Sequence, residues 1–468
     1  MSQDLSPQGD CGAGAAEALY CTVPLIVNAR KLMDAGHFAE ARALLDQSPD
    51  NQKALASELR EIMHRIELAY ETTPEQLLQK LKAEIPDVTP AELKQWTAGG
   101  AAQHRTIDSR IRYFNREPAN IYRFCESARA RRRTMPPKPP HDLVAHLEQI
   151  VKAADATSGE LVVPVDHTVE HSIVVSRTAP GFQRGAQVRA WLPYPQELAQ
   201  QSNVKLIAAL PGKYEVAPVG TPQRTIYFES TVSDEEPTFK VKFSFRSFAR
   251  YPKFADDLAQ PTPRGMDLYL AERLPHISFT PQLLATARQI VGDETNPLRK
   301  ARRIFDFVVQ NIAYAAEEEY STIASISEKA LTTHRGDCGV MSLLFITLCR
   351  ASGIPARWQS GFQTRPGMDD MHDWAEFYVA PFGWLPADTS YGYQESSDPR
   401  IRNFYFGHLD SYRMVLNCDY GRPLIPRKSL LRSEPLDFQR GEVELGDQNL
   451  YFPHWSWNSD VSTKFSDV

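Results

Sequence analysis

The stretch that decides the fold is His334-Arg335-Gly336-Asp337-Cys338-Gly339. Residues 340–351, directly after it, are almost wholly apolar, and Gly353 and Pro355 follow that run. An apolar run of this length is typical of a buried helix, and the glycine and proline beyond it are natural end signals. The aspartate before the cysteine is a good N-cap residue. The sequence therefore predicts a core helix whose first turn contains Cys338.

Cys338 is the candidate nucleophile because of this predicted position. The unpaired N–H groups and the positive end of the dipole at a helix N-terminus favour a thiolate. The same N–H groups are expected to stabilise an oxyanion. Taken alone, a buried cysteine is more often an inert packing residue. The assignment therefore depends on partners elsewhere in the chain.

Two further segments supply those partners as a predicted hairpin. A strand begins at His372-Asp373-Trp374-Ala375-Glu376, and a returning strand follows the turn at Gly383-Trp384-Leu385-Pro386-Ala387-Asp388. Residues that face each other across such a hairpin lie within about 5–8 Å, which brings Asp388 back near His372. A carboxylate there orients an imidazole and stabilises its charged form. Asp373 is the alternative orienter, but neighbouring strand residues point to opposite faces, which favours Asp388.

Cysteine, histidine and aspartate thus follow in the chain order Cys338, His372, Asp388, with a strand-like segment at 357–361 between the first two. Each has a bland alternative, since the histidine is compatible with a satisfied core position and Asp388 with a turn cap. Their combination in this order predicts a nucleophilic triad that carries out acyl transfer through a thioester.

These motifs resemble the transglutaminase-like superfamily, a branch of the papain-like cysteine enzymes, and the likeness covers residues from about Pro297 to Gly392. The matching segments are Gly336 to Cys338, Arg350 to Arg357, His372 to Glu376, and Gly383 to Asp388. The resemblance implies a thiolate at Cys338, a general base and acid at His372, and an orienting carboxylate at Asp388. Members of the superfamily include protein cross-linking transferases, peptidases, amide-forming biosynthetic enzymes and inactive relatives.

The chain departs from the animal cross-linking enzymes, which place a tryptophan upstream of the cysteine as an oxyanion donor. No tryptophan lies between Trp191 and Trp358. Tyr314 and Tyr320 are the candidates for a replacement hydroxyl. The departure argues against protein-glutamine cross-linking.

The chain outside the triad region divides by pattern into an α+β protein. An N-terminal helical region includes helix starts at Thr73-Pro74 and Thr89-Pro90. A middle region changes to period two, as in a β-sandwich-like module. The expected parts are a helical region at 15–133, a Pro-rich linker with a short helix at 134–161, a β-sandwich-like module at 162–260, a papain-like or transglutaminase-like core at 276–400, and an extension packing on the core at 401–468.

Several segments outside the core, among them Trp191 to Pro195, resemble a group of long bacterial transglutaminase-like proteins more loosely. Residues 107–116 look like the helical leader of that group, and Ser411-Tyr412-Arg413 and residues 437–442 look like its tail. The tail is expected to wrap the core, chiefly as packing, and to border the active cleft. His167 and His171 share one face of a predicted strand and are expected to be packed or solvated rather than ligands.

Composition limits partners and compartment. The 468 residues carry a formal net charge of −6, which argues against nucleic-acid binding. Six cysteines without C-x-x-C or paired-histidine spacing predict no zinc or other metal, and no cofactor is implied. No apolar run approaches a membrane span, and the start lacks a signal-peptide pattern. The sequence predicts a cytoplasmic protein by default, or a periplasmic or secreted one if a leader was removed.

Three functions follow from this reading, two of which share one chemistry. The first is a cysteine hydrolase that acts on a peptide or isopeptide amide, and the second is an acyltransferase that forms an amide from an acyl donor and an amine. The third is an inactive core used as a binding module, which an intact Cys338, His372 and Asp388 disfavours. The partner is accordingly a peptide, protein or amine/acyl substrate, and the sequence leaves the oligomeric state open.

Overall fold

The computed structural model describes residues 23–134 and 141–465. Residues 135–140, the Pro-rich part of the predicted linker at 134–161, lie outside the described residues. Within them the chain forms two compact units, one containing residues up to Thr134 with the short segment 273–275, the other containing the rest. Every helix in the described ranges is too short or too polar to cross a lipid bilayer.

The first unit is mainly helical, as predicted, because apolar residues recur at helical spacing. Thr73 and Thr89 each begin a helix with a capping box, in which the threonine hydroxyl and the third helical residue bond each other's backbone N–H groups. The predicted helical leader at 107–116 is wrong, because a β-hairpin turns there at Asp108 and Ser109, both with positive φ. The elements are α2 (Pro24–Asp34), α3 (Phe38–Leu45), η1 (Asp50–Gln52), α4 (Lys53–Ala69), α5 (Pro74–Glu84), α6 (Pro90–Ala98), β1 (His104–Ile107), β2 (Arg110–Tyr113), α7 (Ala119–Phe124) and α8 (Glu126–Arg131).

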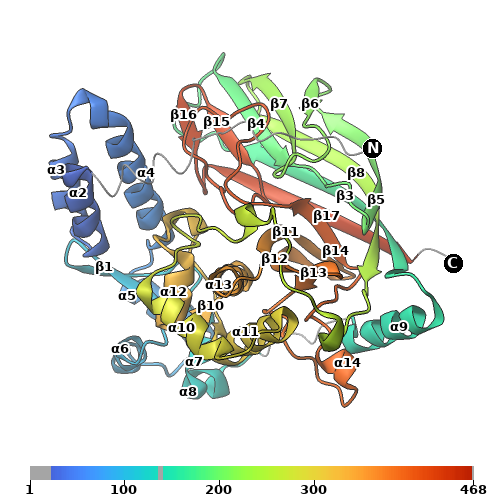
Figure 1. Cartoon of the computed structure of the whole chain (residues 1–468). Coiled ribbons are helices and arrows are strands. Elements are labelled where there is room, and N and C mark those ends of the chain that lie inside the picture. Colours follow the sequence, from blue (N-terminus) through green and yellow to red (C-terminus); the bar gives the residue numbers. More distant parts are fainter. Residues whose placement is uncertain (1–22, 135–140, 466–468) are drawn as a thin grey trace. The chain divides into compact units, whose positions relative to one another are not determined.

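The second unit contains a β-sandwich built from two antiparallel sheets (Figure 1). One sheet has the order β17-β3-β8-β5 and the other β16-β15-β4-β7-β6. Alternate side chains of both sheets, among them Val169, Phe228 and Phe243, fill the core between them. The strands are β3 (Leu161–Val175), β4 (Gln187–Pro193), β5 (Gln201–Leu210), β6 (Tyr214–Val216), β7 (Thr225–Thr231), β8 (Thr238–Arg250), β15 (Glu442–Leu445), β16 (Gln448–Leu450) and β17 (Trp455–Phe465).

Three strands of this sandwich come from the C-terminal tail rather than from the middle of the chain. β17 pairs with β3 along its length, and β15 pairs with β4. The tail was expected to pack on the core, whereas it completes both sheets of the sandwich and adds one strand to the core sheet. Pairing buries edge strands that the middle segment alone would leave open. The predicted domain limits at 162–260 and 401–468 remain predictions.

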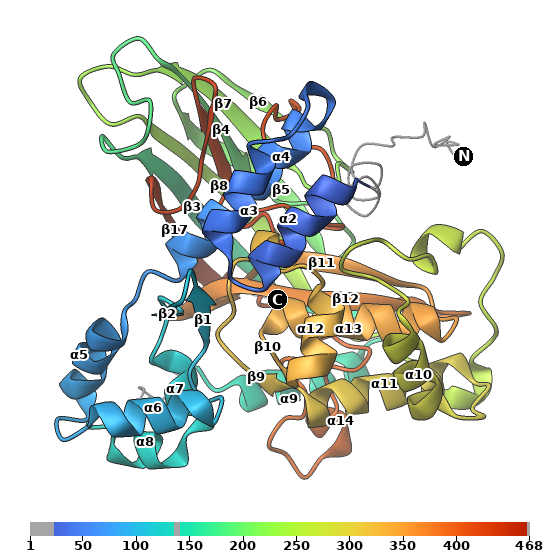
Figure 2. The same ribbon diagram turned by 90° about the vertical axis from the view of Figure 1, so that its left-hand side faces the viewer.

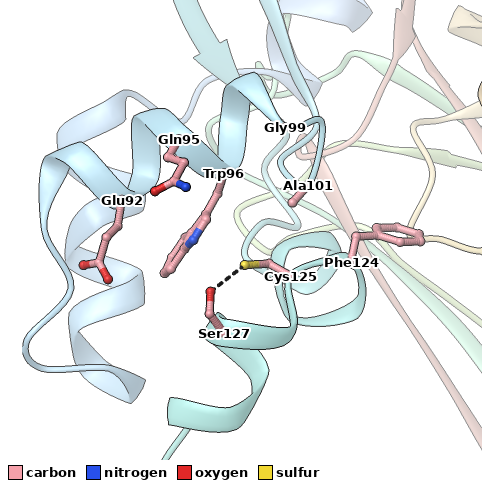
Figure 3. Close-up of a pocket in the computed structure, with 8 residues that line it drawn as sticks. All are labelled: Glu92, Gln95, Trp96, Gly99, Ala101, Phe124, Cys125 and Ser127. Atoms are coloured by element: carbon pink, nitrogen blue, oxygen red, sulfur yellow. Dashed lines mark hydrogen bonds between the residues drawn. The ribbon is translucent and has the colours of Figure 1, made fainter.

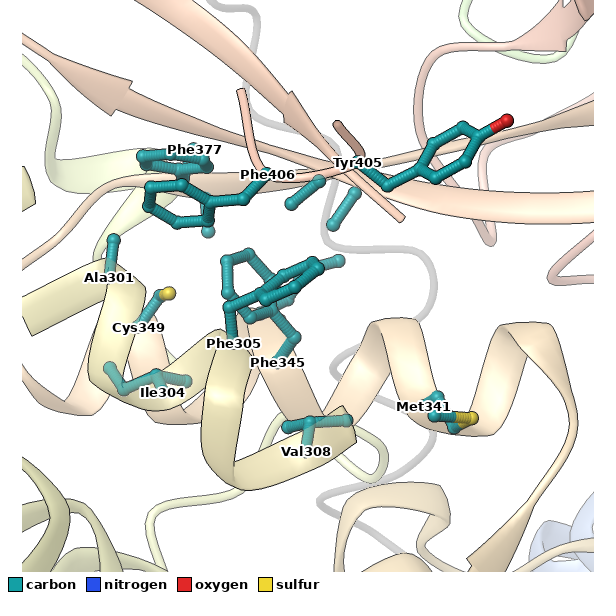
Figure 4. Packing of buried hydrophobic residues seen from close by; sticks show 14 of the residues in the cluster. Ala301, Ile304, Phe305, Val308, Met341, Phe345, Cys349, Phe377, Tyr405 and Phe406 are labelled. Atoms are coloured by element: carbon teal, nitrogen blue, oxygen red, sulfur yellow. The ribbon is translucent and has the colours of Figure 1, made fainter. Parts of the chain in front are cut away.

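The core of the second unit is helix α13 (Cys338–Ala351) packed on a sheet with the order β13-β12-β11-β14 (Figure 2). Nearly every side chain of α13 is buried, as its apolar sequence predicts. Phe345 lies among Phe305 of α11 and Phe377 of β12, in the cluster that Figure 4 shows. This packing fixes α13, and with it Cys338, against strand β12.

The strands of the core sheet are β11 (Ala356–Arg365), β12 (Met368–Val379), β13 (Gly383–Ala387) and β14 (Arg413–Asn417). The remaining elements of the second unit are α9 (Leu143–Ala156), η2 (Asp256–Leu258), η3 (Asp267–Tyr269), α10 (Pro281–Val291), α11 (Pro297–Asn311), β9 (Ala313–Tyr314), η4 (Tyr320–Thr322), α12 (Ile326–Thr333), β10 (Arg335–Gly336) and α14 (Pro399–Arg402). The predicted α+β fold class, with a helical N-terminal region, a sandwich-like middle and a mixed C-terminal core, is confirmed.

Candidate active site

Cys338 is the first residue of α13, as the sequence predicts. Asp337 is the N-cap, and its Oδ1 accepts a hydrogen bond of 3.2 Å from the backbone N–H of Val340. Gly339 stands where any larger residue would strike the ring and hydroxyl of Tyr320. The local sequence therefore sets both the helix start and the close approach of Tyr320.

Tyr320 supplies the hydroxyl nearest the cysteine, and Tyr314 does not share this place. The Tyr320 hydroxyl donates to Asp337 Oδ1 at 2.7 Å and accepts from the N–H of Gly339 at 3.1 Å. Tyr320 is buried, whereas Tyr314 is 41% exposed. Burial, with the carboxylates of Asp337 and Asp373 near it, raises the pKa of Tyr320 well above its usual value. The tyrosine accordingly remains a neutral hydrogen-bond donor.

The thiol of Cys338 lies against Asp373. Its Sγ donates to Asp373 Oδ2 at 3.4 Å, and the side chain is 7% exposed. Burial, followed by the charges of Asp373 and Asp337, raises the pKa of the thiol well above its usual value. Burial and the two carboxylates act against the thiolate that the helix terminus favours, so ionisation of the thiol requires a base.

His372 and Asp388 meet as the hairpin argument predicts. β12 and β13 pair antiparallel, and Asp388 follows the end of β13. His372 Nε2 is 2.7 Å from Asp388 Oδ2, and both side chains are buried. A carboxylate only accepts hydrogen bonds, so Nε2 carries the proton and Nδ1 is left as the basic nitrogen. Strand β12 begins earlier than predicted, at Met368, so His372 lies within the strand.

Asp388 is held ionised by its surroundings. Burial alone pushes its pKa up, but the positive charges of His372 and Arg413 outweigh that effect and lower the pKa below its usual range. Its Oδ1 accepts hydrogen bonds from Ser390 Oγ at 2.9 Å and from the N–H of Tyr391 at 3.1 Å. The alternative orienter, Asp373, bonds the cysteine side of the site instead.

Of the three predicted residues, the structure thus joins His372 to Asp388 directly. Among the described residues it records no hydrogen bond between Cys338 Sγ and the His372 ring. The helix that begins at Cys338 packs on the strand that carries His372 and Asp373. Asp373 is therefore the link between the cysteine and that strand.

The C-terminal tail contributes residues that the triad motifs did not include. Gln439 Nε2 donates to the backbone carbonyl of His372 at 3.0 Å and to Asp373 Oδ1 at 2.8 Å. Arg440 Nη1 lies 2.9 Å from Glu319 Oε1, and Glu319 directly precedes Tyr320. In the sequence, these two residues could be recognised only from the similarity of residues 437–442 to the tail of the long bacterial transglutaminase-like proteins. The contacts of Gln439 and Arg440 bring the tail to the site. From the sequence, packing on the core was expected as the main role of the tail, and bordering the active cleft as a lesser one.

Two hollows elsewhere do not combine a cysteine with a histidine. One, of about 340 Å³ in the first unit, is lined by residues that include Trp96, Cys125 and Ser127 but no histidine (Figure 3). Cys125 Sγ lies 3.2 Å from Ser127 Oγ, a neutral hydroxyl. The other, of about 360 Å³ on the sandwich, contains His167, whose ring nitrogens already bond Ser247 and Thr463. His171 is also buried and hydrogen-bonded, as expected of a packing residue.

A core helix that starts at a buried cysteine, packed on a sheet that carries a histidine–aspartate pair, defines the papain-like class of fold. Residues 284–389 match the model of the transglutaminase-like superfamily. The chain therefore contains a transglutaminase-like core domain, and the resemblance read from its motifs is confirmed.

The individual proteins and structures to which the chain is similar share 25% sequence identity or less with it. An uncharacterised protein of Haemophilus influenzae is 25% identical over 333 residues, which span 62% of this chain and 88% of that protein. The uncharacterised protein YebA of Bacillus subtilis is 24% identical over 135 residues, 25% of this chain and 18% of YebA. Among solved structures, a candidate cysteine protease from Cytophaga hutchinsonii has a TM-score of 0.44 at 16% identity, covering 66% of this chain and 92% of that one. The periplasmic domain of TgpA from Pseudomonas aeruginosa has a TM-score of 0.26 at 15% identity, covering 57% and 98%.

Proposed function

We propose that the chain is a cysteine-dependent acyl-transfer enzyme that hydrolyses a peptide or isopeptide amide through a thioester on Cys338. The observation that carries the proposal is the buried bond of 2.7 Å between His372 and Asp388. Burying such a pair costs free energy that packing alone would not require, and it leaves His372 Nδ1 as a base. Cys338 is its nucleophile because it begins the helix that packs on the strand of His372.

The reaction divides into two halves. In the first, Cys338 gives its proton to His372, and the sulfur attacks the amide carbon to form a C–S bond and an oxyanion. As the C–N bond breaks, the imidazolium returns the proton to the leaving amine, which leaves a thioester. In the second, His372 removes a proton from water, the hydroxyl adds to the thioester, and the carboxylic acid leaves as the proton returns to sulfur. Asp388 stabilises the imidazolium in both halves.

The oxyanion needs hydrogen-bond donors at the helix start. Two first-turn N–H groups are already used, since Val340 bonds Asp337 and Gly339 bonds Tyr320. We assign the N–H of Cys338 itself and the Tyr320 hydroxyl to the oxyanion. Tyr320 then takes the place of the missing tryptophan, by turning its proton from Asp337 toward the substrate.

Acylation by 4-nitrophenyl acetate tests the proposal without knowledge of the natural substrate. Cys338 should carry one acetyl group by mass spectrometry of its peptide, with release of 4-nitrophenolate. Cys338→Ala should lose the adduct, and His372→Ala should lose turnover. Equal ester hydrolysis by wild type and both variants would refute the proposal.

A second arm adds a primary amine, methylamine, to separate hydrolysis from transfer. Hydrolysis predicts acetate as the main product, with little N-methylacetamide. A product that is mainly the amide would replace the hydrolase by an amide-forming acyltransferase with the same thioester.

A further inference from the structure

A row of buried charges continues from Asp388 away from His372. Arg413, on β14, is 3% exposed, and its Nη1 lies 2.9 Å from Asp388 Oδ2. This is the same oxygen that bonds His372 Nε2. Arg413 Nε in turn donates to Asp410 Oδ2 at 3.0 Å, and Asp410 is also buried. The charges therefore alternate in sign from His372 through Asp388 and Arg413 to Asp410.

The far end of the row is fixed by its own contacts. Asp410 Oδ2 accepts from the hydroxyl of Tyr405 at 2.9 Å, and its Oδ1 accepts from the N–H of Tyr412 at 2.9 Å. The guanidinium of Arg413 lies 4.4 Å from the centre of the Tyr391 ring and also faces Trp374. The contact of Arg413 with Asp388 is an ion pair rather than a well-aligned hydrogen bond. Arg413 thus acts on Asp388 mainly through its charge.

We propose that Arg413 and Asp410 are positioning residues that hold Asp388 ionised and directed at Nε2 of His372. The inference rests on the proposed function, because it concerns the base of that reaction. A lone buried carboxylate would take up a proton, and a protonated Asp388 would no longer stabilise an imidazolium. Arg413 prevents this, and Asp410 compensates the charge of Arg413 so that it does not disfavour the charged imidazole.

The two residues should therefore act on His372 with opposite signs. Arg413 and His372 lie within about 6 Å of each other, since both contact one oxygen within 3 Å. Unit charges at that separation, with an effective dielectric constant of about 20, change a proton affinity by about 2 pH units. Removing the positive charge should make it easier for the His372–Asp388 pair to take up a proton, and removing Asp410 should make it harder.

Apart from Arg413 and Asp410, the groups around the His372–Asp388 pair are neutral or more remote. Asp388 Oδ1 faces the hydroxyl of Ser390 and the N–H of Tyr391. Arg365 lies over the Tyr391 ring, with its guanidinium 5.4 Å from the ring centre. Behind Asp410, the His146 ring bonds Ser411. On the opposite side of β12, Asp373 faces Cys338.

The test is the pH profile of kcat/KM for 4-nitrophenyl acetate in the full chain. In Arg413→Met the acid limb should move up by about 2 pH units, because His372 must be unprotonated to accept the thiol proton, and in Asp410→Asn it should move down by a smaller amount. Arg413→Lys keeps the charge and should restore the wild-type limb. Damage to packing alone would lower the rate in every variant and leave the limbs in place.

Limbs that stay fixed, or that move in the same direction in both variants, would overturn the inference. Should Arg413→Met fail to fold, two variants still test the inference: the near-isosteric Asp410→Asn should move the limb down, and the charge-preserving Arg413→Lys should leave it in place. The His372→Ala variant distinguishes a failure of the proposed function from a failure of the role assigned to Arg413 and Asp410. If it keeps the wild-type rate, the proposed function fails, and if it loses the rate while the limbs of the other variants do not move, only the role of Arg413 and Asp410 fails.

Discussion

Replacing Asp388 by asparagine tests the site most directly. The change is nearly isosteric, but it removes the charge that faces His372 Nε2 at 2.7 Å. A buried hydrogen bond to a charged group contributes about 1.5–3 kcal/mol, so losing its stabilisation of the imidazolium slows the reaction by about 10- to 100-fold. An amide at this place also favours the wrong imidazole tautomer, and the combined loss should reach about 10³–10⁴-fold.

The same variant should also lose stability, because Asp388 is paired with Arg413 as well as with His372. Removing one partner of a buried ion pair costs about 3–5 kcal/mol. Arg413 keeps Asp410, so we expect the lower figure of about 3 kcal/mol and a fall in Tm of about 4 °C for a unit of this size. Sequence reasoning alone expects folding to be nearly intact, because the hairpin gives no sign of Arg413.

The assay is acetylation of Cys338 by 4-nitrophenyl acetate, measured well below the melting transition of each variant and accompanied by circular dichroism. Asp306→Asn is the matched control, since Asp306 is also paired with an arginine, Arg302, at 2.9 Å but lies outside the site. It should keep the wild-type rate. A rate for Asp388→Asn within tenfold of wild type, in a folded protein, would refute the orienting role, and a crippled Asp373→Asn beside it would transfer that role to Asp373.

Four further outcomes follow from the structure. Cys338→Ser should abolish acylation, whereas Cys349→Ser, at a fully buried position further along α13, should keep it. The reverse result would show that Cys349, and not Cys338, is the nucleophile. Gln439→Ala should slow acylation by about tenfold, because one side chain holds both the His372 carbonyl and Asp373, and an unchanged rate would make the tail mere packing. Asp373→Asn should lower the pH at which iodoacetamide modifies Cys338, since burial and then the Asp373 charge raise the pKa of the thiol; a profile that moves to higher pH would contradict this. Burial lowers the pKa of His171 to about 4, so the unfolded chain binds a proton at a higher pH than the folded chain does, and stability should fall as the pH drops from about 6.5 to about 4. Tm measured across that window should fall less steeply in His171→Gln. An equal slope in the two proteins would refute the role of His171 in this loss of stability.

The sequence by itself determined what depends on neighbours along the chain. The apolar run after Cys338 and the capping aspartate set helix α13 and its first residue. The turn between two strands set the hairpin that joins His372 to Asp388, because antiparallel pairing fixes which residues face each other. The threonine–proline starts of α5 and α6 are local in the same way.

The tertiary structure decided every feature that joins distant segments. The sequence of the tail predicted an extension that packs on the core, without the strands β15 and β17 or their partners, so the tail's part in the sandwich could not be foreseen. An arginine such as Arg413 looks like any surface arginine until the fold encloses it.

The pKa of the Cys338 thiol is the sharpest example. A helix N-terminus predicts a thiolate, and that effect is local. The opposing effects are burial and the carboxylate of Asp373, which lies on another strand and is held by Gln439 of the tail. Charge and desolvation act through space rather than along the chain, so their balance at Cys338 exists only once the chain has folded.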